Sequence, residues 1–141
     1  MKIALKQALK AYHKKDVPVG AVIVKEGKII AKAYNKKEKQ NNAIMHAEII
    51  AISKACKKLK TWHLKNCILY VTLEPCMMCT GAIIQSRVKK IIYASKNPNY
   101  GFISTNYNAK EKYNIESYYT DDDYTEKSKN LLQQFFKEQR K

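Results

Sequence analysis

The strongest constraint in this sequence is an alternation of helical and strand-like apolar patterns across residues 45–94. Residues 45–60 carry apolar side chains over too wide an arc for a surface stripe, which predicts a largely buried helix. Residues 67–73 and 88–94 are apolar runs of strand length, and residues 77–87 between them return to helical spacing. Because a helix that alternates with buried strands implies parallel strand pairing, we expect an α/β fold.

The flanking segments supply further elements. Residues 2–14 have the spacing of an amphipathic helix, and residues 19–24 and 29–34 are predicted to pair as a hairpin around a turn that contains glycine. Residues 97–123 are polar and rich in tyrosine, with strand character only at 115–119.

A last helix is predicted near the carboxyl terminus, where Asp123 followed by Glu126 resembles a capping box. Its narrow apolar stripe consists of Leu131, Leu132, Phe135 and Phe136. The chain has no internal repeat and no linker rich in glycine, serine or proline, and its 141 residues are 45% hydrophobic. Residues 1–141 are therefore predicted to form a single domain.

The chain carries a large excess of positive charge, with 27 Lys and Arg residues against 12 Asp and Glu residues and a formal net charge of +15. Such a charge favours a polyanionic partner. Arg87 and Arg140 are the only arginines, and a compositional bias of the genome would also produce this preference for lysine. Charge alone therefore gives nucleic acid only moderate support.

No apolar run approaches the roughly 18 residues that a membrane span needs, and residues 1–15 do not resemble a signal or transit peptide. We expect a cytoplasmic protein that does not contact a membrane. In that reducing compartment the four cysteines are better candidates for metal ligation or burial than for disulfides. They are Cys56, Cys67, Cys76 and Cys79.

Two short segments, residues 46–48 (HAE) and 75–79 (PCMMC), each open a predicted helix. Cys76 and Cys79 are three residues apart, so on a first helical turn both sulfurs point from one face and can share a metal. The partial positive charge of a helix amino end also favours thiolates. His46 can supply a third ligand, and one His, two Cys and one solvent molecule are the usual ligands of a catalytic zinc.

Glu48 follows His46 by two residues and is predicted to exchange protons with metal-bound water. Zinc lowers the pKa of bound water from near 16 to about 7, and a carboxylate can move that proton to a substrate ring and its leaving group. These transfers constitute hydrolytic deamination. The alternative is a structural zinc that a fourth protein ligand completes, which would leave Glu48 without a role. The candidates for that ligand are Cys56, Cys67, His13 and His63.

The chain resembles the bacterial tRNA-specific adenosine deaminases, and H-x-E with P-C-x-x-C is a signature of zinc nucleobase deaminases. The likeness rests on residues 17–21 (VPVGA), Asn35, residues 46–49 (HAEI) and residues 69–82 (LYVTLEPCMMCTGA). It implies a cytidine-deaminase-like three-layer α/β/α sandwich, with a five-stranded mixed sheet and helices on both faces. It also implies a homodimer, one zinc ion per chain, and conversion of adenosine to inosine at the wobble position of a tRNA anticodon.

The resemblance further implies roles for single residues. Asn35 corresponds to the residue that holds the flipped base, the backbone at Ala47 contacts that base, and Val19 lines the pocket. Phe136 corresponds to a residue close to the anticodon loop. Without the family, Asn35 is a residue typical of a strand-ending turn.

Basic residues lie near Asn35 and near Phe136 in the sequence. If Asn35 lines the pocket, three lysines that follow it lie at the rim where phosphates pass; otherwise they form a solvated loop. These are Lys36, Lys37 and Lys39. The carboxyl-terminal residues combine aromatic and basic groups as a contact to single-stranded RNA would, although core packing of both phenylalanines is an equal alternative. They are Phe135, Phe136, Lys137, Arg140 and Lys141.

One loop departs from the family pattern. Where members commonly have an Arg-Asp pair and then a Gly- and Ser-rich loop, this chain has Ser95, Lys96 and Asn97 followed by bulkier residues. If Asn97 occupies the Asp position near the substrate backbone, a negative charge is replaced by a neutral hydrogen-bonding group. Our hypothesis is that this departure loosens the demands on the substrate.

Two other functions compete with a tRNA adenosine deaminase. The same zinc chemistry serves deaminases of free cytidine, deoxycytidylate or guanine, and a noncatalytic RNA-binding module could use zinc only for stability. The charge of +15, residues 76–79 and Asn35 favour an RNA substrate.

Overall fold

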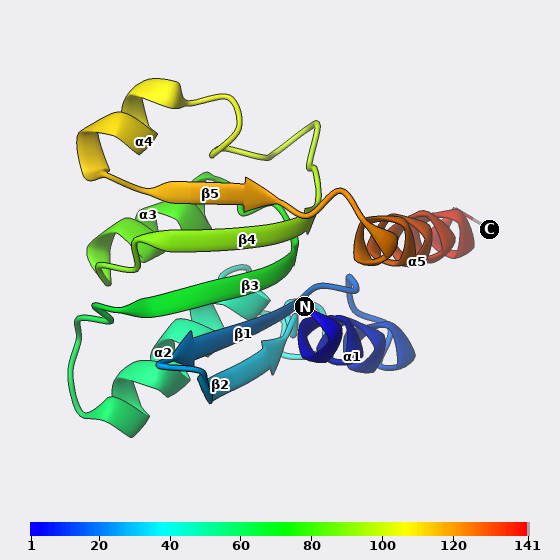
Figure 1. The fold of residues 1–141 in the computed structure, drawn as a ribbon. Helices are drawn as coiled ribbons and strands as arrows, with labels where there is room; N and C mark the ends of the chain where they lie inside the picture. Colours follow the sequence, from blue (N-terminus) through cyan, green and yellow to red (C-terminus); the bar gives the residue numbers. More distant parts are fainter. Residues whose placement is uncertain (141) are drawn as a thin grey trace.

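Five strands form one mixed sheet in the order β2-β1-β3-β4-β5 (Figure 1). They belong to a computed structural model that describes residues 1–140. Its elements in chain order are α1 (Lys2–His13), β1 (Gly20–Lys25), β2 (Lys28–Tyr34), α2 (Ala47–Leu59), β3 (Cys67–Leu73), α3 (Met77–Gln85), β4 (Lys90–Ser95), α4 (Tyr107–Tyr113), β5 (Glu116–Tyr119) and α5 (Asp123–Gln139).

Strand pairing in the sheet changes direction at β3. Strand β1 pairs antiparallel with β2, as the predicted hairpin, and also antiparallel with β3. Strands β3, β4 and β5 are parallel to one another, and α3 and α4 lie in the two connections between them. The parallel pairing predicted from the alternation of helix and strand is confirmed for this half of the sheet, and the hairpin makes the whole sheet mixed.

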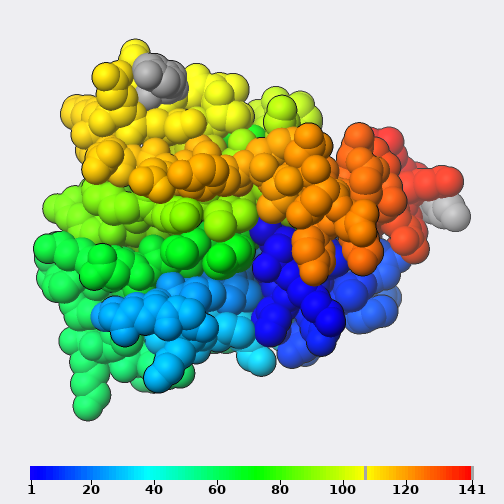
Figure 2. Space-filling model, in the orientation of Figure 1, coloured from blue at the N-terminus to red at the C-terminus, as the bar shows by residue number. Residues whose placement is uncertain are grey.

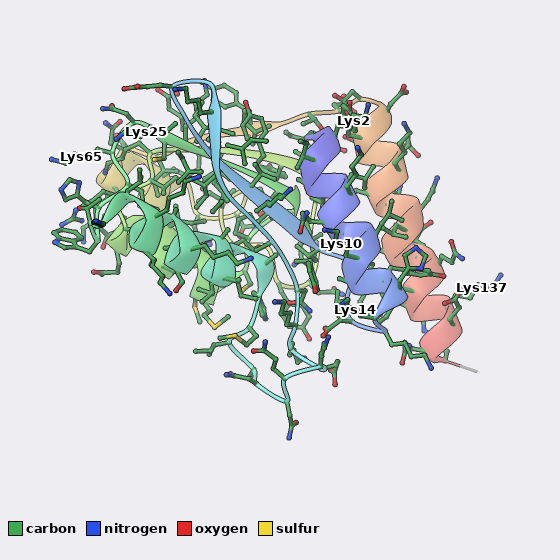
Figure 3. All side chains as sticks on the ribbon, turned by 90° about the horizontal axis from the view of Figure 1, so that it is seen from below. Lys2, Lys10, Lys14, Lys25, Lys65 and Lys137 are labelled. Atoms are coloured by element: carbon green, nitrogen blue, oxygen red, sulfur yellow. The ribbon has the colours of Figure 1, made fainter. Side chains whose placement is uncertain are left out.

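Helices cover both faces of the sheet. Helix α2 packs on β1 and β2 and contacts α3, whereas α1 packs on β1 and β2 from the other side and contacts α5. Figure 3 shows α1 and α5 side by side, separated from α2 by the strands, and Figure 2 shows their surfaces in contact. The three-layer sandwich that the resemblance implies is therefore confirmed. Both faces of the central strands carry buried side chains: Ile23, Leu69 and Ile91 lie on one face, and Val22 and Thr72 lie on the other.

The carboxyl-terminal region differs in detail from the prediction. The capping box of α5 joins Asp122 and Thr125 rather than Asp123 and Glu126, because the Asp122 carboxylate accepts the backbone N–H groups of Tyr124 and Thr125 at 2.9 and 3.4 Å. The short helix α4 lies in a segment whose polar sequence gave no helical pattern. Within residues 1–140, no helix is both long and apolar enough to span a membrane.

The two phenylalanines near the end of α5 have different environments. Phe135 is buried, whereas Phe136 remains 45% exposed and meets the ring of Phe135 edge-on at 5.4 Å. Core packing therefore accounts for only one of them. Lys141, the last of the predicted basic residues, lies outside the described residues.

Helix α1 approaches β1 closely at Gly20. A Cβ atom placed on Gly20 would lie 1.9 Å from the Ala4 carbonyl oxygen and 2.6 Å from the Ala8 backbone nitrogen. Both obstacles belong to the helix backbone, so they cannot rotate away. The absence of a side chain at this position therefore sets the distance between α1 and the sheet.

We expect Gly20→Ala to lower the free energy of unfolding by about 1–3 kcal/mol, because α1 must move away from the sheet. Gly81→Ala in α3 is the matched control. Its added Cβ would meet nothing within 4 Å, so a gain of about 0.5–1 kcal/mol from helix propensity is expected. Urea unfolding of both variants measures the difference, and equal stability of the two would contradict this account of the packing.

Candidate active site

The amino ends of α2 and α3 lie close together, and α3 begins shortly after the end of the central strand β3. His46 is the N-cap residue of α2 and Cys76 is the N-cap residue of α3, and both have extended backbone angles. Cys79 lies in the first turn of α3 and is buried. The loop between β2 and α2 is closed by a 2.9 Å hydrogen bond from the Lys36 N–H to the Met45 carbonyl, which leads the chain into His46.

His46, Cys76 and Cys79 form a group that can hold a metal ion. The His46 Nδ1 atom lies 3.8 Å from the Cys76 Sγ and 3.5 Å from the Cys79 Sγ. Zinc bonds of about 2.0 Å to nitrogen and 2.3 Å to sulfur, at a tetrahedral angle, would place the two ligand atoms about 3.5 Å apart. The side chains therefore already have the spacing that a shared zinc requires.

No fourth protein ligand reaches this group among the described residues. The ligand atoms of the three side chains lie within 4.8 Å of one another, and the group contains no other His, Cys, Asp or Glu. The four alternative ligands considered from the sequence therefore lie outside it: Cys56, Cys67, His13 and His63. This arrangement leaves one tetrahedral position for solvent or substrate.

Cys76 loses its proton more readily than Cys79, because a hydrogen bond between them changes their pKa values in opposite directions. A hydrogen bond from Cys79 lowers the pKa of Cys76 to about 4, and His46 contributes in the same direction. The same hydrogen bond raises the pKa of Cys79. The pKa of His46 is raised, chiefly because its ring hydrogen-bonds to Cys76. One thiolate is thus preformed at the amino end of α3, where the helix dipole favours negative charge.

Glu48 is buried beside this group, with one carboxylate oxygen unpartnered. Its side chain is 3% exposed, and Oε2 has no hydrogen-bond partner among the described residues. Burial raises the pKa of this carboxyl group. A buried carboxylate oxygen without a hydrogen bond costs free energy. Because Oε2 lies next to three potential metal ligands, we expect its hydrogen-bond partner to be a reactant, such as a bound water.

Asn35 is held by a buried acid that the sequence interpretation missed. Asp16 is fully buried, and its Oδ1 accepts a 2.7 Å hydrogen bond from the Asn35 amide. The Asn35 N–H also donates to the Val19 carbonyl at 3.0 Å, so these two predicted pocket residues are adjacent. The one available sequence signal was the position of Asp16 directly before the VPVGA segment.

A second missed acid fixes the loop that contains Asn97. Glu74 is buried and accepts the backbone N–H of Asn97 at 3.3 Å and both the N–H and hydroxyl of Ser104, at 3.0 and 2.7 Å. Gly101 forms an isolated antiparallel bridge with Cys76, so the loop lies against the start of α3. The Asn97 side-chain oxygen accepts the Tyr100 N–H at 3.2 Å within the loop.

Of the other predicted site residues, Ala47 and Asn97 lie in segments that meet the potential metal ligands, whereas Phe136 does not. Ala47 is buried in the first turn of α2, between the His46 and Glu48 positions, and Asn97 is joined to the site through its loop. Phe136 lies on α5, which packs on the sheet face opposite α2 and α3 (Figure 1). The structure does not bring Phe136 together with the potential metal ligands.

Known proteins resemble this chain in sequence and in fold. A family model described as MafB19-like deaminase matches residues 1–140. A tRNA-specific adenosine deaminase from Bacillus subtilis is 43% identical over 100% of this chain and 89% of its own length. A solved structure from a study of A-to-I editing by tRNA:A34 deaminases at the wobble position of transfer RNA has a TM-score of 0.84 and 32% identity. That likeness covers 94% of this chain and 97% of the other.

Another solved structure resembles a shorter part of this chain. A guanine deaminase from Bacillus subtilis is 44% identical with a TM-score of 0.64, over 67% of this chain and 61% of that one. Similarity in sequence and fold therefore extends to a protein that is named for a different nucleobase.

We expect Cys76 in the metal-free protein to be a thiolate at neutral pH and to take up its proton only near pH 4. After chelation, the ultraviolet absorbance of the thiolate should persist until that pH and should be lost in Cys76→Ser. Burial raises the pKa of Cys56 and Cys67, so neither should contribute at neutral pH. A titration centred near the ordinary value of about 8.5 would contradict the shared-proton arrangement.

Proposed function

The chain belongs to the MafB19-like deaminase family, and we propose that it performs the reaction for which its full-length relatives are named, deamination of adenosine in tRNA. The product is inosine, with release of ammonia, at the wobble position of an anticodon. The observation that carries the proposal is the group of three potential metal ligands with a buried, unpartnered carboxylate beside it. Relatives that are 41–44% identical over 97–100% of this chain are named for tRNA adenosine, which favours that substrate.

The cofactor of the proposed reaction is one zinc ion per chain, held by His46, Cys76 and Cys79. Two sulfurs and one nitrogen suit zinc, and three protein ligands are typical of a catalytic site. When bound, zinc supplies a water molecule acidic enough to lose a proton near neutral pH. The structural-zinc alternative is disfavoured by the composition of the group.

Glu48 would carry protons between water and substrate. Its buried carboxylate can accept the proton that water loses on Oε2, which has no hydrogen-bond partner among the described residues, and pass it to the adenine ring nitrogen. It can then take the proton of the new C–OH group and pass it to the amino group, which leaves as ammonia. Because burial raises its pKa, the protonated form is accessible for this second step.

Asn35, Val19 and Ala47 would hold the flipped base. The bond to Asp16 fixes the Asn35 side chain and leaves one amide hydrogen and the carbonyl oxygen for the nucleotide. Val19 is nearly buried and lies beside Asn35, so it forms an apolar wall. Such a pocket holds a base that has left its stack.

The partner in this proposal is the anticodon stem-loop of a tRNA. The charge of +15 suits a polyanion more than a neutral nucleoside, and the exposed ring of Phe136 is suited to stacking on a base. A homodimer, a cytoplasmic location and the absence of membrane contact complete the proposal, on the strength of the resemblance to the family.

The proposal is tested by inosine formation on anticodon stem-loops that carry adenosine at the wobble position. We expect Glu48→Ala to lower the rate by at least about 10²-fold, because general acid–base catalysis is lost, while the metal content is retained. Glu111→Ala, which removes an exposed acid on α4, is the control. A Glu48→Ala variant of unchanged activity would contradict the assignment, and ammonia release from guanine alone would favour the guanine deaminase reaction.

Asn97→Asp tests the loop that departs from the family. The added charge would stand next to the substrate backbone, so we expect it to raise the preference for a tRNA stem-loop over a matched DNA stem-loop. Rates of deamination on both nucleic acids, for the unaltered chain and the variant, give the ratio. A ratio that does not change would refute our hypothesis on this residue.

A further inference from the structure

Three lysines from two distant segments gather around one aromatic ring next to Asn35. Lys14 follows α1, and Lys36 follows β2; their Nζ atoms lie 5.6 and 5.0 Å from the centre of the Tyr34 ring. The charges of Lys14 and Lys39 act on each other and on Tyr34, so all three cations share a small region. Ammonium groups over an aromatic face are held by cation–π attraction, which limits the conformations they sample. We call Lys14, Lys36 and Lys39 the Tyr34 lysine cluster.

Within the part of the chain that the structure describes, no acidic side chain forms an ion pair with this cluster. Among the described residues the one ion pair joins Lys37 to Glu38, at 3.9 Å, and it involves none of the three lysines. Asp16 lies close by but is fully buried, and its carboxylate accepts hydrogen bonds from Asn35 and from backbone N–H groups. The positive charges therefore remain available to an external anion.

The neighbouring groups respond to this excess charge. The pKa of Tyr34 is lowered, first by its hydrogen bond with Lys14 and further by the charges of Lys36 and Lys39. The pKa of Lys39 is lowered mainly because the like charge of Lys14 lies close to it. Repulsion of this kind is relieved when an anion binds between the cations.

The cluster has a fixed position relative to the proposed base pocket. The Asp16 Oδ2 accepts the backbone N–H groups of Glu38 and Lys39, each at 3.0 Å, while its Oδ1 holds Asn35. One buried carboxylate thus orients the pocket residue and the lysine loop together. Figure 3 shows Lys14 at the end of α1 near the loop between β2 and α2, whereas Lys25 and Lys65 lie at the opposite end of the molecule.

We propose that the Tyr34 lysine cluster is a phosphate-binding site for the RNA backbone beside the nucleotide that Asn35 holds. The inference rests on the proposed function, since it takes the base pocket as given. Each lysine offers hydrogen-bond donors to phosphate oxygens, and three of them can grip a backbone without reading its sequence. Lys37, which the sequence groups with Lys36 and Lys39, is not among the lysines around Tyr34, and its Nζ lies 3.9 Å from the Glu38 carboxylate.

The test measures binding of a labelled anticodon stem-loop RNA across a range of salt concentrations. The RNA carries inosine at the target position, so it binds without reacting. Lys14→Gln, Lys36→Gln and Lys39→Gln are compared with two controls that remove the same charge, Lys37→Gln and Lys65→Gln. Fluorescence anisotropy gives the dissociation constant of each variant.

Loss of one contact to a single-stranded phosphate is expected to reduce the salt-dependence exponent by about 0.7. Each cluster variant should therefore bind about fivefold more weakly at 0.1 M salt and equally well at 1 M. Controls that match the unaltered chain would support the site. Cluster variants that lose no more affinity than Lys37→Gln and Lys65→Gln would overturn it.

Neutral methylphosphonate linkages in the RNA locate the contact. At a phosphate that the cluster binds, this replacement should weaken binding to the unaltered chain but cause no further loss in the cluster variants. If every methylphosphonate weakens the variants as much as the unaltered chain, the phosphate site lies elsewhere and the inference fails. Failure of the proposed function is separate, because it would appear as the absence of inosine formation by the unaltered chain.

Discussion

The site depends on two helices whose amino ends converge at one place. His46 and Cys76 occupy the N-cap positions of α2 and α3, and neither side chain caps its helix. A residue that hydrogen-bonds the first helical turn would stabilise each helix by about 0.5–2 kcal/mol. These positions hold potential metal ligands instead, so neither helix has the stabilisation of a side-chain cap. The positive ends of both helix dipoles then face the thiolate and any anionic group bound there.

Two buried carboxylates hold the loops that lie next to these helix amino ends. Asp16 holds Asn35 and the chain after it, and Glu74 holds the loop from Asn97 to Ser104. Each acid accepts several hydrogen bonds within the protein interior, where such bonds are strong and losing one is costly. The proposed base pocket and its rim are therefore built on segments that hydrogen bonds to buried acids already hold, which reduces the entropy that substrate binding would lose.

The sequence allowed the order and type of most elements to be predicted, with boundaries within two residues of those observed. Periodicity succeeds there because burial of one face dominates. The ligand group was also predictable, since the spacing of Cys76 and Cys79 is local. Asp16 and Glu74 were missed because their partners lie 19 to 30 residues away in sequence. Helix α4 and the capping box at Asp122 depend on polar contacts that leave no periodic pattern.

The central claim is that three protein ligands leave one metal position open. X-ray absorption spectroscopy at the zinc edge on the purified protein tests it most directly, because sulfur and lighter ligands scatter differently. We expect two sulfur ligands from Cys76 and Cys79, one imidazole nitrogen from His46 and one solvent oxygen. A third sulfur or a second imidazole in the zinc coordination shell would contradict it.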